Sequence, residues 1–358
     1  MVNGVYTKGT ALSSTNTIVL PVTVTTLGSY SVITNTVDGI SFRGAGTFTV
    51  SGNQNLTLTG SGIPTSTADK VMTITSNSAD GASTCSIIVV ITIPIKKVLH
   101  IGAETAYGYS AYTGPSRSLM DSSTNFGTVA TSIVKSGGYT HTSLGASPAN
   151  SVLLTALNNK PDIVIVGYPY IADATAAGYF ANYLNNKGVL IAFGDDTPSS
   201  QNLMRAIFSD PAISTVYGGG AGSVYAISNT NDPILNGPFG DVRGKNWGED
   251  ASTTVNISGL TSGFIPYSYA QPINSTTSRT GISGLRHSSL NFVWFGDGGF
   301  LSNENANEYN SVTIEPFVAP SSGGYRPIQK SSYGYAGNGY ISGGMQVQNA
   351  IIFANILA

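Results

Sequence analysis

Four acidic residues each follow directly after a short apolar segment. Glu104 comes after VLHIGA, Asp195 and Asp196 come after VLIAFG, and Asp297 comes after NFVWFG. If these segments are neighbouring parallel strands, their carboxyl ends meet at the sheet edge where open α/β sheets bind ligands. Carboxylates there suit Ca²⁺ or Mg²⁺, or accept hydrogen bonds from sugar hydroxyls. We predict a ligand site here, with Asp195, Asp196 and Asp297 as metal candidates and no other cofactor; the alternative is helix caps and turns.

A dense group of charged residues surrounds Trp247 in the segment NDPILNGPFGDVRGKNWGEDAS. One interpretation makes Trp247 an aromatic platform for a sugar or peptide, with polar groups beside it. The other makes the segment an ordered loop in which Arg243 pairs with carboxylates. The charged residues of this segment are Asp232, Asp241, Arg243, Lys245, Glu249 and Asp250.

The stretch from Gly299 to Gly344 has little regular pattern and is rich in Gly, Ser, Asn and Tyr. Binding loops use this composition because Tyr gives a large contact area at a small entropic cost. A loop this long inside a compact domain is usually functional or disordered. We therefore predict that Tyr325 and Tyr335 contact a ligand; the alternative is extra strands or an ordered flap over the sheet.

The residues of nucleophilic and acid–base catalysis are sparse. Cys85 is the sole cysteine, and its place in an apolar strand predicts a small core residue. The chain has no G-x-S-x-G motif. His100 lies within an apolar strand and is expected in the core, whereas His141 and His287 stand in polar, loop-like surroundings. These residues predict no catalytic site.

The elements that would position these residues fall into two kinds. From Asn16 to Pro94, β-branched residues alternate with polar ones, and turn signals such as Asp38-Gly39 and Gly52-Asn53 interrupt them at short intervals. This pattern predicts an all-β domain over residues 1–95, an immunoglobulin-like sandwich without the Cys and Trp hallmarks. We expect Pro94 to form the hinge that follows this domain.

After Ile95, apolar strands alternate with helical segments. The strands VLHIGAE, DIVIVGYPY and VLIAFGDD are separated by a helix expected near Ser116–Lys135 and by ATAAGYFANYLNNKG, and the chain ends in the helix VQNAIIFANIL. Such alternation predicts a mainly parallel sheet with helices on both faces, a three-layer α/β domain over residues 96–358.

The order of these segments resembles the class I glutamine amidotransferase-like and flavodoxin-like folds, and the first domain resembles immunoglobulin-like repeats of bacterial surface proteins. In the amidotransferases, the strand that matches VLIAF leads into a turn carrying a catalytic Cys. Here that turn reads Phe193-Gly194-Asp195-Asp196, with neither Cys nor Ser. The resemblance therefore implies the fold without amidotransferase activity, and we expect a protein that is not an enzyme.

Composition narrows the class of partner. Charged residues make up 9% of the chain, against about 25% in an ordinary soluble domain. A net charge of -2 argues against a nucleic-acid partner, and the apolar run from Cys85 to Ile95 is too short to span a bilayer. The first residues, MVNGVYTKGT, show no secretory signal. A neutral, hydroxyl-rich surface favours an extracellular or virion-associated protein.

Three functions fit these observations. The first is a non-catalytic structural or receptor-engaging component of an extracellular particle, such as a phage virion or tail or a contractile injection system. Its partners would be other subunits of the assembly and a cell-surface glycan or receptor. The second is a secreted cell-surface adhesin or carbohydrate-binding fragment. The third is a metal-dependent hydrolase that uses the acidic residues at the strand ends.

Overall fold

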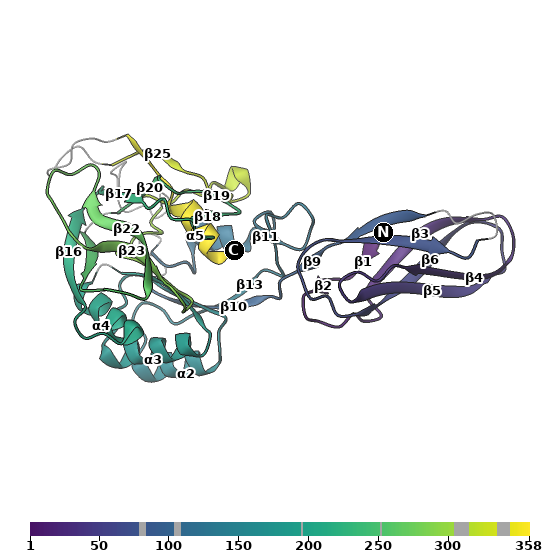
Figure 1. Ribbon diagram of the computed structural model, residues 1–358, viewed down its shortest axis with the longest axis horizontal. Coiled ribbons are helices and arrows are strands. Elements are labelled where there is room, and N and C mark those ends of the chain that lie inside the picture. The colour runs from purple at the N-terminus through teal and green to yellow at the C-terminus, as the bar shows by residue number, and fades with distance from the viewer. Residues whose placement is uncertain (79–83, 104–108, 195, 251–252, 304–314, 335–343) are drawn as a thin grey trace. The chain divides into compact units, whose positions relative to one another are not determined.

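The computed structural model (Figure 1) describes residues 1–358 except 79–83, 104–108, 195, 251–252, 304–314 and 335–343. The chain forms two compact units. The first, here called the β unit, contains Met1–Ile95 and Phe126–Gly138; the second, the α/β unit, contains Lys96–Asn125 and Tyr139–Ala358. The protein thus combines an α/β fold with a β-rich domain.

One segment belongs to a different unit from the one predicted. Phe126–Gly138 joins the β unit, and the helix expected near Ser116–Lys135 is limited to α1, Gly114–Asp121. The physical reason is backbone pairing. The amide of Ile93 donates to the carbonyl of Lys135, and the amide of Gly137 donates to the carbonyl of Ile93, 2.8 Å in each case. Within the segment, β11 (Phe126–Gly127) and β12 (Val134–Lys135) pair in parallel.

The β unit is built on one antiparallel sheet of seven strands in the order β1-β3-β6-β5-β4-β7-β8. A short parallel pair joins β2 to β9. The strands are β1 (Val2–Asn3), β2 (Tyr6–Thr7), β3 (Thr17–Val24), β4 (Gly28–Thr34), β5 (Ile40–Phe48), β6 (Gly52–Gly62), β7 (Lys70–Ser76), β8 (Cys85–Val89) and β9 (Ile91–Thr92).

Alternation along the strands builds the core of the β unit. In β6, Leu56 and Leu58 are buried while the threonine between them is exposed, as expected of strands with one face in a core. Met72 and Ile91 complete this core with other apolar residues. Cys85 is exposed, which corrects the prediction of a core residue. It begins β8, the last strand in the sheet order.

The α/β unit contains an eleven-stranded mixed sheet with the main order β13-β10-β14-β15-β24-β23-β22-β17-β20. The strands are β10 (Lys96–Ile101), β13 (Tyr139–Ser143), β14 (Ile163–Val166), β15 (Val189–Phe193), β16 (Ser214–Gly220), β17 (Val224–Ile227), β20 (Asn246–Gly248), β21 (Thr253–Ser258), β22 (Phe264–Pro272), β23 (Ile282–His287) and β24 (Phe292–Phe295). Small pairs are formed by β18 (Asn236–Gly237) with β19 (Gly240–Asp241) and by β25 (Lys330–Tyr333) with β26 (Met345–Val347).

Only the first half of this sheet is parallel. Neighbours from β13 to β24 run parallel, whereas β24, β23, β22, β17 and β20 pair antiparallel. The prediction of a mainly parallel sheet is therefore corrected. Strand–helix alternation stops after α4 (Thr197–Phe208). The described residues from 213 to 291 contain no helix, so their strands connect by hairpins and loops rather than by helical crossovers.

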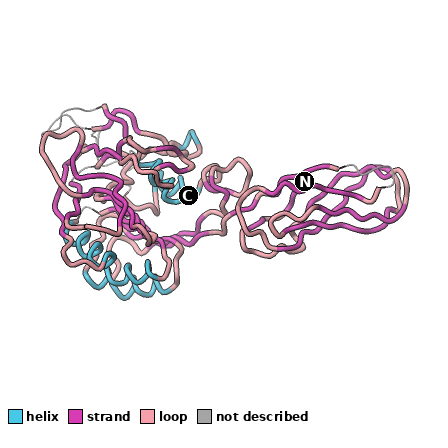
Figure 2. The backbone as a smooth tube through the Cα atoms, in the orientation of Figure 1, coloured by secondary structure: helices cyan, strands magenta, loops and turns pink. Residues whose placement is uncertain are grey.

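The helices lie in the α/β unit (Figure 2), as far as the described residues extend. Besides α1, they are α2 (Asn150–Asn158), α3 (Ala174–Asn185), α4 (Thr197–Phe208) and α5 (Asn349–Leu357), with a short 3₁₀ turn at Ser321–Gly323. Figure 1 shows α2, α3 and α4 side by side, with α5 on the other side of the sheet. Apolar residues of α2 to α4 pack with the parallel strands in one core. Among the described residues, no helix has the length and apolarity needed to cross a bilayer.

Candidate functional site

A crevice of about 360 Å³ opens at the carboxyl ends of β14 and β15, where open α/β sheets bind ligands. It is lined by the segment after β14, by the turn from β15 into α4, and by residues of β16 and β21. Its lining consists of Tyr168, Pro169, Tyr170, Ile171, Phe193, Gly194, Asp196, Ser199, Tyr217 and Thr253. The Tyr168-Pro169 peptide bond is cis.

Hydrogen bonds connect two parts of the lining, the segment after β14 and the start of α4. Asp196 caps α4, because its Oδ1 accepts a hydrogen bond of 2.7 Å from the amide of Ser199. Ser199 Oγ in turn accepts a bond of 2.8 Å from the amide of Ala172. Asn202 Nδ2 donates to the carbonyl of Ala172 at 3.1 Å. The segment after β14 is therefore held by hydrogen bonds to the first two turns of α4.

Two tyrosines present partly exposed rings at the crevice. Tyr168 is 42% exposed and Tyr217 is 55% exposed. The ring of Tyr168 meets Tyr109 edge to face, with 5.3 Å between the ring centroids. At Gly167, a Cβ atom would lie 2.4 Å from the carbonyl oxygen of Tyr109, so only glycine allows this approach. Packing of this segment against Tyr109 thus fixes the position of Tyr168.

Of the acidic residues predicted at the strand ends, Asp196 lines the crevice and also caps a helix. The helix-cap interpretation is confirmed at this residue, whereas its role in a ligand site stays a prediction. Glu104 and Asp195 lie outside the described residues.

Asp297 comes together with a different pair of carboxylates, Glu249 and Asp250. One oxygen of each residue lies within 4.8 Å of the others, and all three residues are at least 96% buried. The amide of Gly299 donates to Asp297 Oδ1 at 3.0 Å. Oxygen donors of this kind suit Ca²⁺ or Mg²⁺. In the sequence, Glu249 and Asp250 belong to the group of charged residues around Trp247. That unusual concentration of charge was the one sign in the sequence that they could form a site.

Trp247 is part of the core, which corrects its prediction as a binding platform. The side chain is fully buried. It stacks on Tyr225 at 4.5 Å between ring centroids and meets Phe295 edge to face. The stack follows from strand register, because Trp247 on β20 lies directly opposite Tyr225 on β17. Arg243 pairs with Asp241 through two hydrogen bonds of 2.9 and 2.8 Å, as the ordered-loop interpretation expected.

Tyr325 is only partly buried and occupies a turn. Its φ is +58°, and its carbonyl accepts a bond of 2.9 Å from Asn125 Nδ2. It does not line the crevice at β14 and β15. Tyr335 lies outside the described residues. In the described parts of Gly299–Gly344, a 3₁₀ turn and β25 form, in line with the alternative of extra ordered structure.

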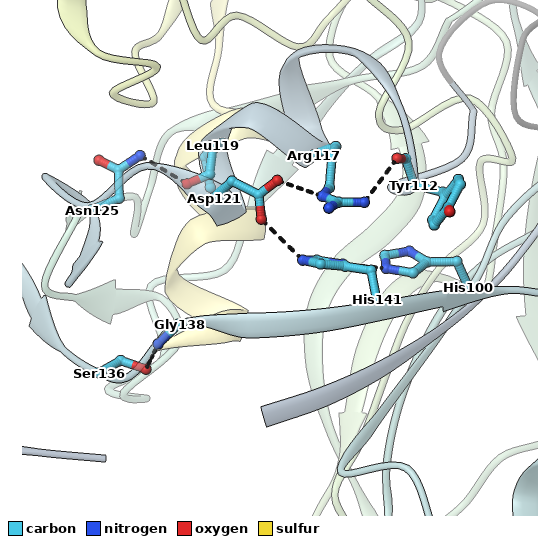
Figure 3. A network of polar contacts seen from close by, with 9 residues as sticks. All are labelled: His100, Tyr112, Arg117, Leu119, Asp121, Asn125, Ser136, Gly138 and His141. Carbon is cyan, nitrogen blue, oxygen red and sulfur yellow. Dashed lines mark hydrogen bonds and ion pairs between the residues drawn. The ribbon is translucent and has the colours of Figure 1, made fainter. Parts of the chain in front are cut away.

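A histidine pair was missed by sequence reasoning (Figure 3). His141 lies on β13, not in a loop, and β13 pairs with β10, which carries His100. His100 Nε2 lies 2.8 Å from His141 Nδ1, and His141 Nε2 lies 3.1 Å from Asp121 Oδ1. Arg117 Nε donates to the other oxygen of Asp121 at 2.6 Å. No sequence signal connects two histidines 41 positions apart, since only strand order brings them together.

The histidine pair is inaccessible to a substrate. His100 is fully buried, and the side chain of His141 is 2% exposed. Desolvation by burial lowers the pKa of His100 to about 3, and the nearby His141 and Arg117 contribute to this decrease. Desolvation also lowers the pKa of His141, and the positive charge of Arg117 lowers it further, whereas Asp121 raises it. Both shifts favour the neutral form of the two imidazoles.

Comparison with known proteins gives no family. No protein-family model and no curated protein matches the chain. Among solved structures it is similar to a ThuA-like protein from Bacteroides uniformis, with 9% identity over 57% of this chain and 82% of that one, at a TM-score of 0.36. A second similarity is to a protein described as an alpha-galactosidase from Bacteroides fragilis, with 13% identity, 55% and 37% coverage and a TM-score of 0.12. The chain thus spans just over a third of that protein. Likenesses this slight carry no argument about function.

Proposed function

We propose that this chain is a non-catalytic, receptor-engaging surface protein of an extracellular particle, and that its α/β unit binds a neutral carbohydrate in the crevice after β14 and β15. The observation that carries the proposal is the lining of that crevice. It joins partly exposed tyrosine rings to side-chain oxygens, and its described residues include no Lys, Arg or His.

The chemistry of the lining suits a sugar. The rings of Tyr168 and Tyr217 offer apolar faces for the C–H side of a sugar ring and hydroxyls at their ends. Asp196 and Thr253 add side-chain oxygens that accept bonds from sugar hydroxyls. An acidic ligand would meet Asp196 without a cation to offset the repulsion. These features favour a neutral ligand.

The same lining supports binding without hydrolysis. Glycoside hydrolases usually work with two carboxylates, one on each side of the bond that breaks. Among the described residues of the crevice, Asp196 supplies the one carboxylate, and that group already accepts the cap bond from Ser199. The trio of Glu249, Asp250 and Asp297 is buried. We therefore assign the crevice a recognition role.

The order of the strands supports a specific fold for each of the two units. In the β unit, β1-β3-β6-β5 followed by β4-β7-β8 has the order ABED and CFG of constant-type immunoglobulin sandwiches. We propose that the β unit is such a sandwich, related in architecture to surface-protein repeats. For the α/β unit, parallel β13 to β24 with helices on both faces agree with a flavodoxin-like or amidotransferase-like core that carries an antiparallel extension.

The low charge of the chain supports an extracellular setting, in which the partners are other subunits and a cell-surface glycan. A secreted adhesin would use the same crevice. The two alternatives therefore differ in whether the protein is bound to other subunits of a particle. Native mass measurement of the untagged protein from its source should find it bound to particle subunits. A free monomer in the medium would favour the adhesin.

A glycan array tests the binding function. We expect wild-type protein to bind neutral oligosaccharides and not sialylated, sulfated or uronic ones. For the best neutral hit, Tyr217→Ala should weaken binding at least tenfold, about 1.4 kcal/mol. Tyr269→Ala is the matched control, because Tyr269 is 58% exposed in the same unit but does not line the crevice. Equal loss in both variants, no glycan binding at all, or hydrolysis of the bound glycan would contradict the proposal.

A further inference from the structure

A second cavity adjoins the crevice. It has a volume of about 330 Å³ and lies at the amino-terminal ends of α2 and α3. Three consecutive residues, Pro169, Tyr170 and Ile171, line both cavities. The remaining lining of the second cavity is Ser147, Pro148, Ala149, Asn150 and Asp173. The two cavities are therefore neighbours on either side of one short segment.

The segment between the cavities is held firmly and presents an apolar side chain. Ile171 is 61% exposed. On its N-terminal side, the ring of Tyr170 packs edge to face against Phe180 at 6.2 Å between centroids. On its C-terminal side, the amide of Ala172 donates to Ser199 Oγ. A ligand that crosses from one cavity to the other would pass over the exposed side chain of Ile171.

The second cavity shares the chemistry of the first. Asn150 Nδ2 donates a bond of 2.8 Å to Asp173 Oδ2, and the amide of Ala176 donates to Asp173 Oδ1 at 2.8 Å. These bonds lower the pKa of Asp173, and the positive end of α3 offsets its charge. The described lining contains no Lys, Arg or His. Hydroxyl, amide and carboxylate groups beside an apolar surface are again suited to a neutral, polyhydroxylated ligand.

We infer that the ligand is a neutral oligosaccharide that occupies both cavities and crosses Ile171, so that the second cavity is an extension subsite of the crevice. This inference rests on the proposed carbohydrate-binding function. Each cavity lies near the lower end of the range of about 300–1,000 Å³ found for small-ligand sites. One cavity alone therefore accommodates a short sugar, and affinity has to increase with chain length until both are filled.

Series of oligosaccharides of increasing length, here called length ladders, test the inference. The probes are oligomers of one to six units of glucose, mannose, galactose and N-acetylglucosamine, each titrated by calorimetry. For the ladder that binds, we expect at least a tenfold gain in affinity between the disaccharide and the tetrasaccharide or longer members. An affinity that stays constant from the monosaccharide to the hexasaccharide would overturn the inference.

A blocking variant identifies the second cavity as the source of the gain. Ser147 is exposed and lines only that cavity, so Ser147→Trp should fill it. We expect this variant to keep the affinity for the disaccharide and to lose the gain with length. Ser151→Trp, at an exposed position of α2 outside the lining, should behave as wild type. A full gain with length in Ser147→Trp would contradict the inference.

The two proposals fail in different ways. Binding of short sugars that depends on Tyr217, without any effect of length or of Ser147→Trp, would remove the extension subsite and leave the crevice. Absence of binding to every ladder would contradict the carbohydrate-binding function itself.

Discussion

His100 Nε2 lies 2.8 Å from Nδ1 of His141, deep in the α/β unit. A hydrogen bond at this distance needs one proton between the two nitrogens, so one ring donates and the other accepts. Around the pair stand Arg117, Asp121 and the ring of Tyr112, which meets His100 edge to face at 5.6 Å. His141 has a carboxylate beside it, whereas no described residue bonds to His100 Nδ1. Protonation of His100 is therefore strongly opposed.

This arrangement predicts that stability falls in acid. The pKa of His100 is about 3 in the folded protein, below its ordinary value of about 6.5 in an unfolded chain. The unfolded chain therefore binds the extra proton first. The stabilisation is fully present above pH 6.5 and is lost as pH decreases from 6.5 towards 3, on the order of 5 kcal/mol in total. Urea unfolding at steps between pH 7 and pH 4 measures the larger part of this loss.

Two variants separate the buried pair from other titrating groups. His100→Leu removes the titration and should flatten the decrease in unfolding free energy between pH 6.5 and pH 4, from a lower starting stability. His287→Gln, at the end of β23, should retain most of the decrease. The same pH profile in His100→Leu and wild type would show that other groups cause the acid sensitivity.

Substitutions at two glycines test how the segment after β14 packs beside the crevice. Gly167→Ala places a Cβ 2.4 Å from the backbone oxygen of Tyr109, so we expect a loss of about 1–3 kcal/mol in the free energy of unfolding and weaker glycan binding. Gly178→Ala, in α3, has nothing within 4 Å of the new Cβ. It should stabilise by about 0.4–1 kcal/mol. Thermal melts compare them, and equal effects would contradict the packing described.

Asp196 has two separable roles. Asp196→Ala removes the cap of α4 and should cost about 0.5–2 kcal/mol, whereas Asp196→Asn preserves a capping oxygen and should cost a few tenths. If the side chain also accepts a bond from a sugar hydroxyl, Ala should weaken glycan binding more than Asn does. Denaturant melts and calorimetry measure the two effects. A destabilised Asn variant would mean that the charge, not the cap bond, is what α4 requires.

The unit boundary can be tested with a fragment. In a chain of residues 96–358, the amide of Gly137 loses its acceptor, the carbonyl of Ile93. Hydrogen exchange should therefore show Gly137 protected in the full chain and unprotected in the fragment. The amide of Leu190, which donates to Asn291 within the α/β unit, should remain protected in both. Loss of protection at Leu190 would mean that the α/β unit does not fold alone.

The sequence pattern predicted those elements of the fold that depend on a few adjacent residues. The apolar runs of β10, β14 and β15 and the acidic residue at the start of α4 are visible in the sequence because each is set by a few adjacent residues. Trp247 was misinterpreted because its neighbours in the chain are polar, whereas its burial depends on the pairing of β20 with β17. The histidine pair and the Asp297 trio also depend on contacts between distant segments.

The crevice could not be predicted from the sequence for the same reason, because its lining comes from distant segments. Asp196 could be placed at a strand end from sequence, but Tyr217 joins the lining from β16, a strand that pairs with β21 outside the parallel part of the sheet. No pattern in the chain joins Tyr217 to the segment after β14. The aromatic character of the site therefore emerged only from the fold.

Mapping of backbone-amide chemical shifts during titration with a neutral oligosaccharide locates the carbohydrate site on the protein. We predict that the largest changes fall on the residues around the crevice, at Tyr168, Gly194 and Tyr217, and extend to Asn150 with longer oligomers. In the β unit, the amides of Leu58 and Met72 should not shift. Changes confined to the β unit, or a titration without any shift at Gly194 and Tyr217, would contradict the assignment of the crevice as the carbohydrate site.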